Sequence, residues 1–147
     1  MSRRPKISGI NLFKVPVTDL SRSTTWWQQV YGARVTTEFA SRDGSLKSLY
    51  LDVPGLGCPV ALEQRPKHAA ALAGFRLVDF AVNTRADLES WLVHLDRLGV
   101  QHGGVFFGST GWATRFKDPD GIEHQLYTRE KHGQDLAGLP GRERPVS

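Results

Sequence analysis

Apolar and polar residues alternate in two similar stretches of this chain, and each stretch predicts a half-buried strand. The first covers residues 10–17 and the second covers residues 75–82. Every second side chain of a strand points to the same face of its sheet. The apolar residues that share a face in the two stretches are Phe13, Val15 and Val17, and then Val78, Phe80 and Val82.

A helix is predicted after each of these strands. Asp19 or Ser21 can cap the first helix, which extends to about Tyr31, and Gly32 follows as a stop signal. The second helix covers about 86–98. Its boundary and apolar residues are Thr84, Leu88, Trp91, Leu92, Leu95, Leu98 and Gly99.

Three more strands follow each helix, so each half of the chain reads β-α-β-β-β. They are expected at 34–39, 46–53 and 59–64 in the first half, and near 100–106, 111–117 and 122–128 in the second. The last two strands are joined at Asp118-Pro119-Asp120-Gly121, which has a turn-forming residue at every position. The chain is therefore predicted to be an α+β protein built from an internal repeat.

The repeat divides the chain into five parts. They are a basic N-terminal arm (1–8), a first module (9–64), a linker (65–74), a second module (75–128) and a mobile C-terminal tail (129–147). One β-α-β-β-β module has a sheet with one face covered by its helix and one bare face. Two modules can bury their bare faces against each other or around a ligand, within one chain or between two chains.

Composition and charge exclude several classes of protein. The chain has 147 residues, of which 39% are hydrophobic and 23% charged, as in folded proteins without a membrane span. The net charge of +4 lies at the ends, because residues 1–8 carry +3 and residues 129–147 carry +1. A neutral body argues against nucleic acid as a partner. With one cysteine, Cys58, and no apolar stretch of the secretory type, a cytoplasmic location is expected.

Residues 9–128 resemble the vicinal oxygen chelate superfamily. The resemblance is carried by the paired modules, by the turn at 118–121 and by the end of the first strand, Val17-Thr18-Asp19-Leu20. This superfamily includes glyoxalase I, extradiol dioxygenases, fosfomycin-modifying enzymes and bleomycin-binding resistance proteins. The resemblance implies a cupped, barrel-like mixed sheet with the helices outside. It also implies a homodimer, since bare faces in this superfamily often pair across a twofold axis.

Metal-dependent members of the superfamily place one ligand on each of four strands. The corresponding positions in this chain are Leu12, Glu63, Leu77 and Gln125. Leucine has no donor atom and an amide is a poor ligand, so neither a metal nor another cofactor is expected. His124 is next to one of these positions, but the strand alternation predicts that it belongs to the face covered by the helix.

The predicted ligand-binding residues lie at and beside these positions. Lys14 and Asp79 are each two residues beyond a vacant position and are expected to point to the bare faces, where they can form a pair. The pair can be a salt bridge, or it can anchor the carboxylate or phenol of a ligand. Trp112 and Tyr127 are expected to add aromatic surface, with Trp112 as the preferred stacking surface for a flat ligand.

Three functions remain open from the sequence. The favoured one is sequestration of a small aromatic or amphipathic molecule in an apolar cavity without metal, as in the bleomycin-binding branch. The second is a metal-independent isomerase, epimerase or cyclase, with Lys14, Asp79, Glu63 or Glu123 as acid and base. The third is a metal-dependent lyase or dioxygenase with ligands at other positions. The favoured partners are a small molecule and a second copy of the chain, with no nucleic acid and no membrane.

Overall fold

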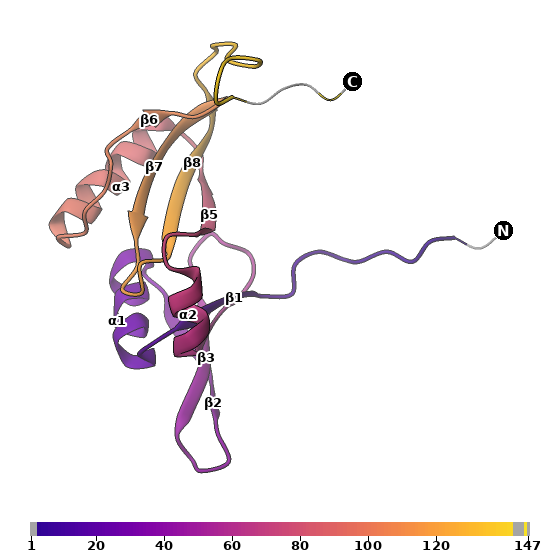
Figure 1. Ribbon diagram of the computed structural model, residues 1–147, viewed down its shortest axis with the longest axis vertical. Helices are drawn as coiled ribbons and strands as arrows, with labels where there is room; N and C mark the ends of the chain where they lie inside the picture. The colour runs from indigo at the N-terminus through magenta and orange to yellow at the C-terminus, as the bar shows by residue number, and fades with distance from the viewer. Residues whose placement is uncertain (1–2, 143–145, 147) are drawn as a thin grey trace. The chain divides into compact units, whose positions relative to one another are not determined.

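In a computed structural model, residues 3–142 and 146 are described (Figure 1). Positions 1–2 of the predicted arm, and 143–145 and 147 of the predicted tail, lie outside the described residues. The chain forms two compact units, Met1–Pro66 and Lys67–Ser147, each with its own sheet. Among the described residues, no helix has the length and apolar character needed to cross a membrane.

The first unit has the predicted β-α-β-β-β order. Its elements are β1 (Phe13–Val17), α1 (Leu20–Tyr31), β2 (Arg34–Ala40), β3 (Leu46–Asp52) and β4 (Val60–Gln64). The strands lie in the order β1-β4-β3-β2, with β1 parallel to β4 and the other pairs antiparallel. The sheet is open, because β1 and β2 are its two edges.

The position of helix α1 is determined by capping residues at its two ends and by the packing of its buried face. The N-cap is Asp19, one of the two predicted candidates, and its Oδ1 accepts the backbone N–H of Arg22 at 3.0 Å. The helix ends at Gly32, whose φ of 66° is in the left-handed region that glycine adopts without strain. Trp27 of this helix is fully buried, and the helix contacts β4 of the sheet.

The second unit repeats this order after one additional helix. Its elements are α2 (Pro66–Leu72, which starts at the unit boundary), β5 (Arg76–Val82), α3 (Arg85–Arg97), β6 (Phe106–Phe107), β7 (Gly111–Lys117) and β8 (Glu123–Lys131). The strand order is β5-β8-β7-β6, with β5 parallel to β8. The α+β fold and both repeated modules are confirmed, but each sheet stays open rather than closing into a barrel.

Three boundaries differ from the sequence expectation. Most of the expected linker forms α2, because its alanine-rich stretch favours helix. The strand expected near 100–106 is only two residues long, Phe106–Phe107. Before it, His102 forms an isolated bridge with Phe116. Gly104, between them, has a φ of 73°, which is outside the range of an extended strand. Strand β8 continues to Lys131, where it pairs with Gly111, so the first residues of the expected tail belong to the sheet.

The turn at 118–121 is organised by one carboxylate. Asp118 is 7% exposed, and its Oδ1 accepts the backbone N–H groups of Asp120 at 2.9 Å and Ile122 at 3.1 Å. Its Oδ2 lies 3.2 Å from Nε2 of His124, which is fully buried and stacked on Phe116. His124 therefore lies in the layer covered by the helix, as the strand alternation predicts.

Acidification is expected to destabilise the second unit through His124. Burial lowers the pKa of this imidazole below 6.5, although Asp118 acts in the opposite direction. The unfolded chain therefore binds the proton more readily, and stability is lost as the pH falls below about 6.5, by at most about 1.4 kcal/mol per pH unit. Urea unfolding between pH 7.5 and 5.5 measures this slope. His124→Gln should reduce this slope; an equal slope in the variant and the parent protein would contradict the assignment.

Candidate functional site

One face of the second sheet is left bare by α3. Helix α3 contacts β5, β7 and β8 from the other side, where Val78, His124 and Leu126 are buried. The strand register and the alternation of side chains along each strand show which residues point to this bare face of the second unit. They are Leu77, Asp79 and Ala81 of β5, Phe106 of β6, Ala113, Arg115 and Lys117 of β7, and Glu123, Gln125 and Tyr127 of β8.

A chain of hydrogen bonds crosses the middle of this bare face. Gln125, only 4% exposed, donates from Nε2 to Oδ2 of Asp79 at 2.9 Å. Its Oε1 accepts Nε–H of Arg115 at 2.9 Å. Partial burial raises the pKa of the Asp79 carboxyl above 3.8. The hydrogen bond from Gln125 and the positive charges of Arg76 and Arg115 lower this pKa, but by less than burial raises it. Both ends of the Gln125 amide are therefore occupied.

Arg115 is held on this face at three points. Beside its bond to Gln125, its Nε lies 3.7 Å from Oε1 of Glu123, and its guanidinium carbon lies 4.7 Å from the ring centre of Phe106. Glu123 is bonded more closely to Nε of Arg76, at 3.0 Å. The Arg115 side chain is 41% exposed. Its terminal nitrogens are thus available to an anion arriving over the ring of Phe106.

A hollow of about 420 Å³ lies at the end of this face where β5 and β8 finish. It is lined by Asp79, Phe80, Ala81, Thr110, Tyr127, Thr128 and Arg129. The Tyr127 hydroxyl accepts the backbone N–H groups of Thr110 at 2.9 Å and Gly111 at 3.1 Å, which fixes the ring. Gly108 has no room for a side chain, because an added Cβ would overlap the Tyr127 ring.

The bare face of the first unit carries a second ion-pair group. Oε2 of Glu63 lies 3.1 Å from Nζ of Lys14, and its Oε1 accepts Nε–H of Arg65. The bond to Arg65, assisted by Lys14, lowers the pKa of Glu63 below 4.5. Lys14 and Asp79 belong to different units, and each has a partner within its own unit. Their mutual pairing stays a prediction.

The residues present do not fit a metal ion. Of the four family positions, Leu12 and Leu77 offer no donor atom, Glu63 is bound by two cations, and both ends of the Gln125 amide are occupied. Within the described part of the chain, no three His, Cys, Asp or Glu side chains are grouped as a metal site would require.

Trp112 lies on the opposite face of the second sheet from Asp79. Ala113 is opposite Tyr127 and Arg115 is opposite Gln125, so the alternation of β7 turns Trp112 to the side of α3. There the guanidinium carbon of Arg85 lies 5.2 Å from the Trp112 ring centre. Trp112 therefore does not share a face with Asp79 and Tyr127. Phe106 is the aromatic ring that lies beside Arg115.

Arg115 is the site residue that sequence reasoning missed, although a signal was present. The turn at 118–121 joins β7 and β8, and pairing outward from it sets Lys117 against Glu123 and Arg115 against Gln125. Because Gln125 is a family ligand position, the residue opposite it across the turn, Arg115, could be identified from the sequence as a cation on the same face.

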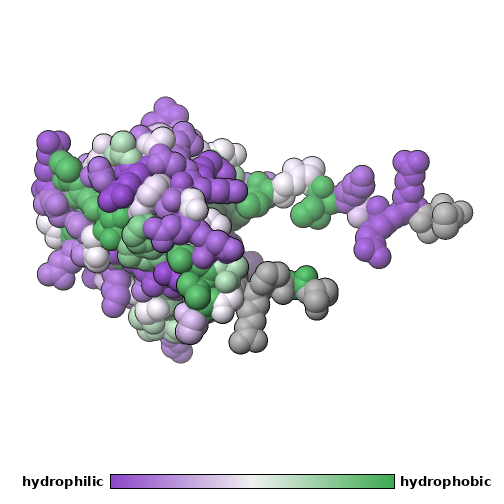
Figure 2. Space-filling model, turned by 90° about the horizontal axis from the view of Figure 1, so that it is seen from above, coloured by the Kyte–Doolittle hydropathy of each residue, from purple (hydrophilic) through white to green (hydrophobic). Residues whose placement is uncertain are grey.

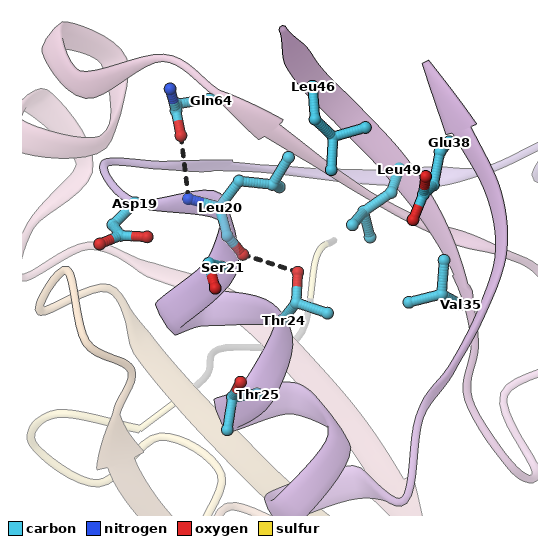
Figure 3. Close-up of a pocket in the computed structure, with 10 residues that line it drawn as sticks. All are labelled: Asp19, Leu20, Ser21, Thr24, Thr25, Val35, Glu38, Leu46, Leu49 and Gln64. Carbon is cyan, nitrogen blue, oxygen red and sulfur yellow. Dashed lines mark hydrogen bonds between the residues drawn. The ribbon is translucent and has the colours of Figure 1, made fainter. Parts of the chain in front are cut away.

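A second hollow, of about 370 Å³, lies in the first unit between α1 and strands β2 and β3 (Figure 3). We call it the helix-side hollow. It is lined by Asp19, Leu20, Ser21, Thr24, Thr25, Val35, Glu38, Leu46, Leu49 and Gln64. Oε1 of Gln64 accepts the N–H of Leu20 at 3.0 Å and so fixes the start of the helix. None of the residues predicted to bind a ligand lines it.

Comparisons with known proteins agree on the fold. TnmS3, an antibiotic binding protein from Streptomyces sp. CB03234, is 21% identical, with a TM-score of 0.70, 85% of this chain and 98% of that chain covered. A glyoxylase/bleomycin resistance protein/dioxygenase domain from Frankia sp. EAN1pec is 19% identical, with a TM-score of 0.69 and coverages of 84% and 98%. The fosfomycin resistance protein FosX from Listeria monocytogenes is 16% identical, with a TM-score of 0.66 and coverages of 84% and 94%.

Among curated proteins, no sequence matches this chain. A family model matches residues 9–126, nearly the same range as the two predicted modules. Its description is Glyoxalase/Bleomycin resistance protein/Dioxygenase superfamily. The chain belongs to this superfamily.

Proposed function

We propose that the protein binds a small aromatic or amphipathic anion on the bare face of its second unit, without metal, and sequesters it. The observation that carries the proposal is Gln125. It occupies a family ligand position, yet its amide joins Asp79 to Arg115 by hydrogen bonds of 2.9 Å. A residue engaged in this way organises polar groups for a ligand rather than holding an ion.

The charges of this face favour an anionic ligand. This face carries Arg115 and Lys117 together with Asp79 and Glu123. The charge of Glu123 is offset by its ion pair with Arg76, and Arg129 lines the adjoining hollow. A carboxylate or phenolate can accept hydrogen bonds from the terminal nitrogens of Arg115. A flat ring can pack against Phe106 and Leu77 in the same region. No covalent step is needed for sequestration.

The structural neighbours support a binding role at the level of the fold. TnmS3 is described as an antibiotic binding protein and FosX as a fosfomycin resistance protein. At 21% and 16% identity, the likeness is carried by the fold rather than by the site. An aromatic anion is therefore favoured by Arg115, Phe106 and Gln125 of this chain.

A metal-independent enzyme is the second candidate, and Asp79 is the observation that favours it. A carboxyl whose pKa is raised by burial can take up a proton more readily than an ordinary aspartate. Incubation with each bound compound, followed by mass spectrometry, separates the two functions. Unchanged compound supports sequestration, and a changed product with loss of turnover in Asp79→Asn supports the enzyme.

We expect the purified protein to hold no stoichiometric zinc, iron, manganese or nickel. The physical reason is the chemistry of Leu12, Leu77 and Gln125 at the family ligand positions, and the engagement of Glu63 with Lys14 and Arg65. Elemental analysis of protein purified without chelator tests this. Near one metal per chain, lost in Glu63→Gln, would show that the ligand set has been misread.

A thermal-shift screen tests the proposed function directly. Aromatic carboxylates, phenols and thiol conjugates are each added to the protein, because a compound that binds the native state raises its melting temperature. The expected pattern is a rise with aromatic anions that exceeds the rise with their neutral amides. Equal or absent shifts across the anions and amides would exclude the proposed ligand class.

We also propose that the protein forms a homodimer. Each sheet has one bare face, and a closed twofold dimer is the commonest symmetric assembly. Light scattering at micromolar concentration is expected to give twice the mass of the 16.3 kDa chain. A mass equal to one chain at that concentration would contradict this proposal.

A further inference from the structure

The helix-side hollow has an apolar floor, and none of its ten lining residues belongs to the second unit. Leu20 and Leu49 are buried there, and Val35 and Leu46 project into it from β2 and β3 (Figure 3). Leu46 stays 40% exposed. Apolar residues also lie among polar ones on the face shown in Figure 2, and single exposed residues of this kind are common. A hollow of about 370 Å³ lined by several of them has the size of a small-molecule pocket.

A β-bulge directs Leu46 into this hollow. Glu38 of β2 is opposite Leu49 of β3. Two residues further along β2, Ala40 is opposite Leu46, so β3 has one more residue than β2 between these two pairs. Without the extra residue, the alternation of side chains would turn Leu46 to the other face of the sheet. Bulges re-aim side chains in this way and are frequent beside binding sites.

The charge of the hollow is negative. Glu38 directs its carboxylate from β2 toward Leu49 (Figure 3). Within the described part of the chain, this carboxylate has no ion pair or hydrogen bond. Asp19 supplies a second carboxylate, and none of the ten lining residues is Lys, Arg or His. A carboxylate beside apolar surface, with no cation in the lining to offset it, favours a cationic ligand.

The start of α1 does not reverse this preference. Backbone N–H groups at a helix N-terminus can bind an anion when they are free. Here the N–H of Leu20 is bonded to Gln64 and that of Arg22 to Asp19, each at 3.0 Å. The N–H of Ser23 is bonded to the carbonyl of Asp19, also at 3.0 Å. An anion would therefore compete with acceptors that the chain already provides.

We propose that the helix-side hollow binds an organic ammonium ion with an apolar body. The apolar body would cover Leu46 and Leu49, and the ammonium group would donate hydrogen bonds to Glu38 at the rim. The Thr24 hydroxyl donates to the carbonyl of Leu20 at 2.6 Å, which leaves its oxygen as a further acceptor. This ligand class is opposite in charge to the one proposed for the bare face of the second unit, and the two sites share no residue.

Calorimetric titration with 2-naphthylmethylamine, an ammonium ion at neutral pH, tests this proposal. The ammonium ion should bind about fivefold more tightly than the neutral 2-naphthalenemethanol. Glu38→Gln should remove this difference, whereas Glu89→Gln, at an exposed carboxylate on α3, should preserve it. Leu46→Lys, which adds a cation to the hollow, should weaken binding of the ammonium ion by more than about tenfold, and Leu139→Lys should not. An ammonium ion that binds no better than the alcohol, or is insensitive to Glu38→Gln and Leu46→Lys, would overturn the proposal.

Competition distinguishes this site from the bare face of the second unit. Saturation with 2-naphthoate should change the affinity for the ammonium ion by less than about twofold. Amide chemical shifts of isotope-labelled protein should change in α1, β2 and β3 as the ammonium ion is added. Displacement by naphthoate, or shift changes centred on β5 and β8, would place the ammonium ion on the bare face and overturn the proposal. Binding of the ammonium ion in the hollow by a protein that fails to bind naphthoate would support this inference and contradict only the proposed function.

Discussion

Replacing Arg115 with glutamine is expected to weaken the binding of an aromatic carboxylate by about 10- to 100-fold. Arg115 offers its terminal nitrogens from a position set by Gln125 and Phe106, and a hydrogen bond to a charged group contributes about 1.5–3 kcal/mol. Calorimetric titration with 2-naphthoate as the probe measures the change. The loss should be specific to the charge, so the affinity for the neutral 2-naphthamide should change by less than about threefold.

The matched control for Arg115 is Arg85. It is also an arginine beside an aromatic ring, but it lies over Trp112 on the side of α3. Arg85→Gln should therefore leave the naphthoate affinity unchanged. If Arg85→Gln causes the larger loss, the ligand binds beside Trp112, as the sequence first suggested, and our assignment of the face is wrong.

Replacing Asp118 with alanine is expected to destabilise the second unit by about 3 kcal/mol. The change removes the acceptor of two backbone N–H groups and the partner of the buried His124. Each buried polar group left without a partner costs about 1–3 kcal/mol, with partial relief where water can enter. Urea denaturation followed by far-ultraviolet circular dichroism gives the free energy of unfolding.

Asp43, in the turn between β2 and β3 of the first unit, provides the control for Asp118. Its Oδ1 accepts Ser45 N–H at 2.9 Å and the Ser45 hydroxyl at 2.6 Å, but the side chain is exposed. Asp43→Ala should therefore destabilise the protein much less than Asp118→Ala does. Similar losses in the two variants would mean that burial of Asp118 and His124 adds nothing to the turn.

The fold was predictable from the sequence because each module carries local signals that agree with its packing. The alternation in residues 10–17 and 75–82 reappears as strands β1 and β5, and Asp19 and Thr84 cap the helices that follow. The turn at 118–121 sets the register of β7 against β8. Strand alternation, capping and turn chemistry are all local, so one sequence is sufficient to read them.

The boundaries that differ depend on interactions outside the local pattern. Helix α2 starts at Pro66, and residues 65–74 were predicted to be a linker between the modules. In the structure, Ala69 of this helix is fully buried. Strand β8 extends past Thr128 because Glu130 N–H bonds to the carbonyl of Asn83 and His132 N–H bonds to that of Thr110, each at 2.9 Å. Tertiary contacts of this kind decide where an element ends, and residue type does not reveal them.

The site was predicted in part. The alternation predicted that Asp79 points to the bare face, and the register of β5, β7 and β8 places Gln125 and Tyr127 on the same face. Trp112 was proposed as a stacking surface from its aromatic character alone, and its position within β7 places it on the side of α3; its contact with a ligand stays a prediction. The helix-side hollow had no sequence signal, since Leu20 and Glu38 come from elements whose packing distance no local pattern specifies.

Titration of 2-naphthoate into metal-stripped protein tests the central claim most directly. The protein is dialysed against a chelator, and the dissociation constant is measured by calorimetry before and after addition of Mn²⁺ or Zn²⁺. We expect the stripped protein to bind naphthoate, with an affinity that added metal changes by less than about twofold. Arg115→Gln should lose this binding. Binding that requires added metal and disappears in Glu63→Gln would contradict it.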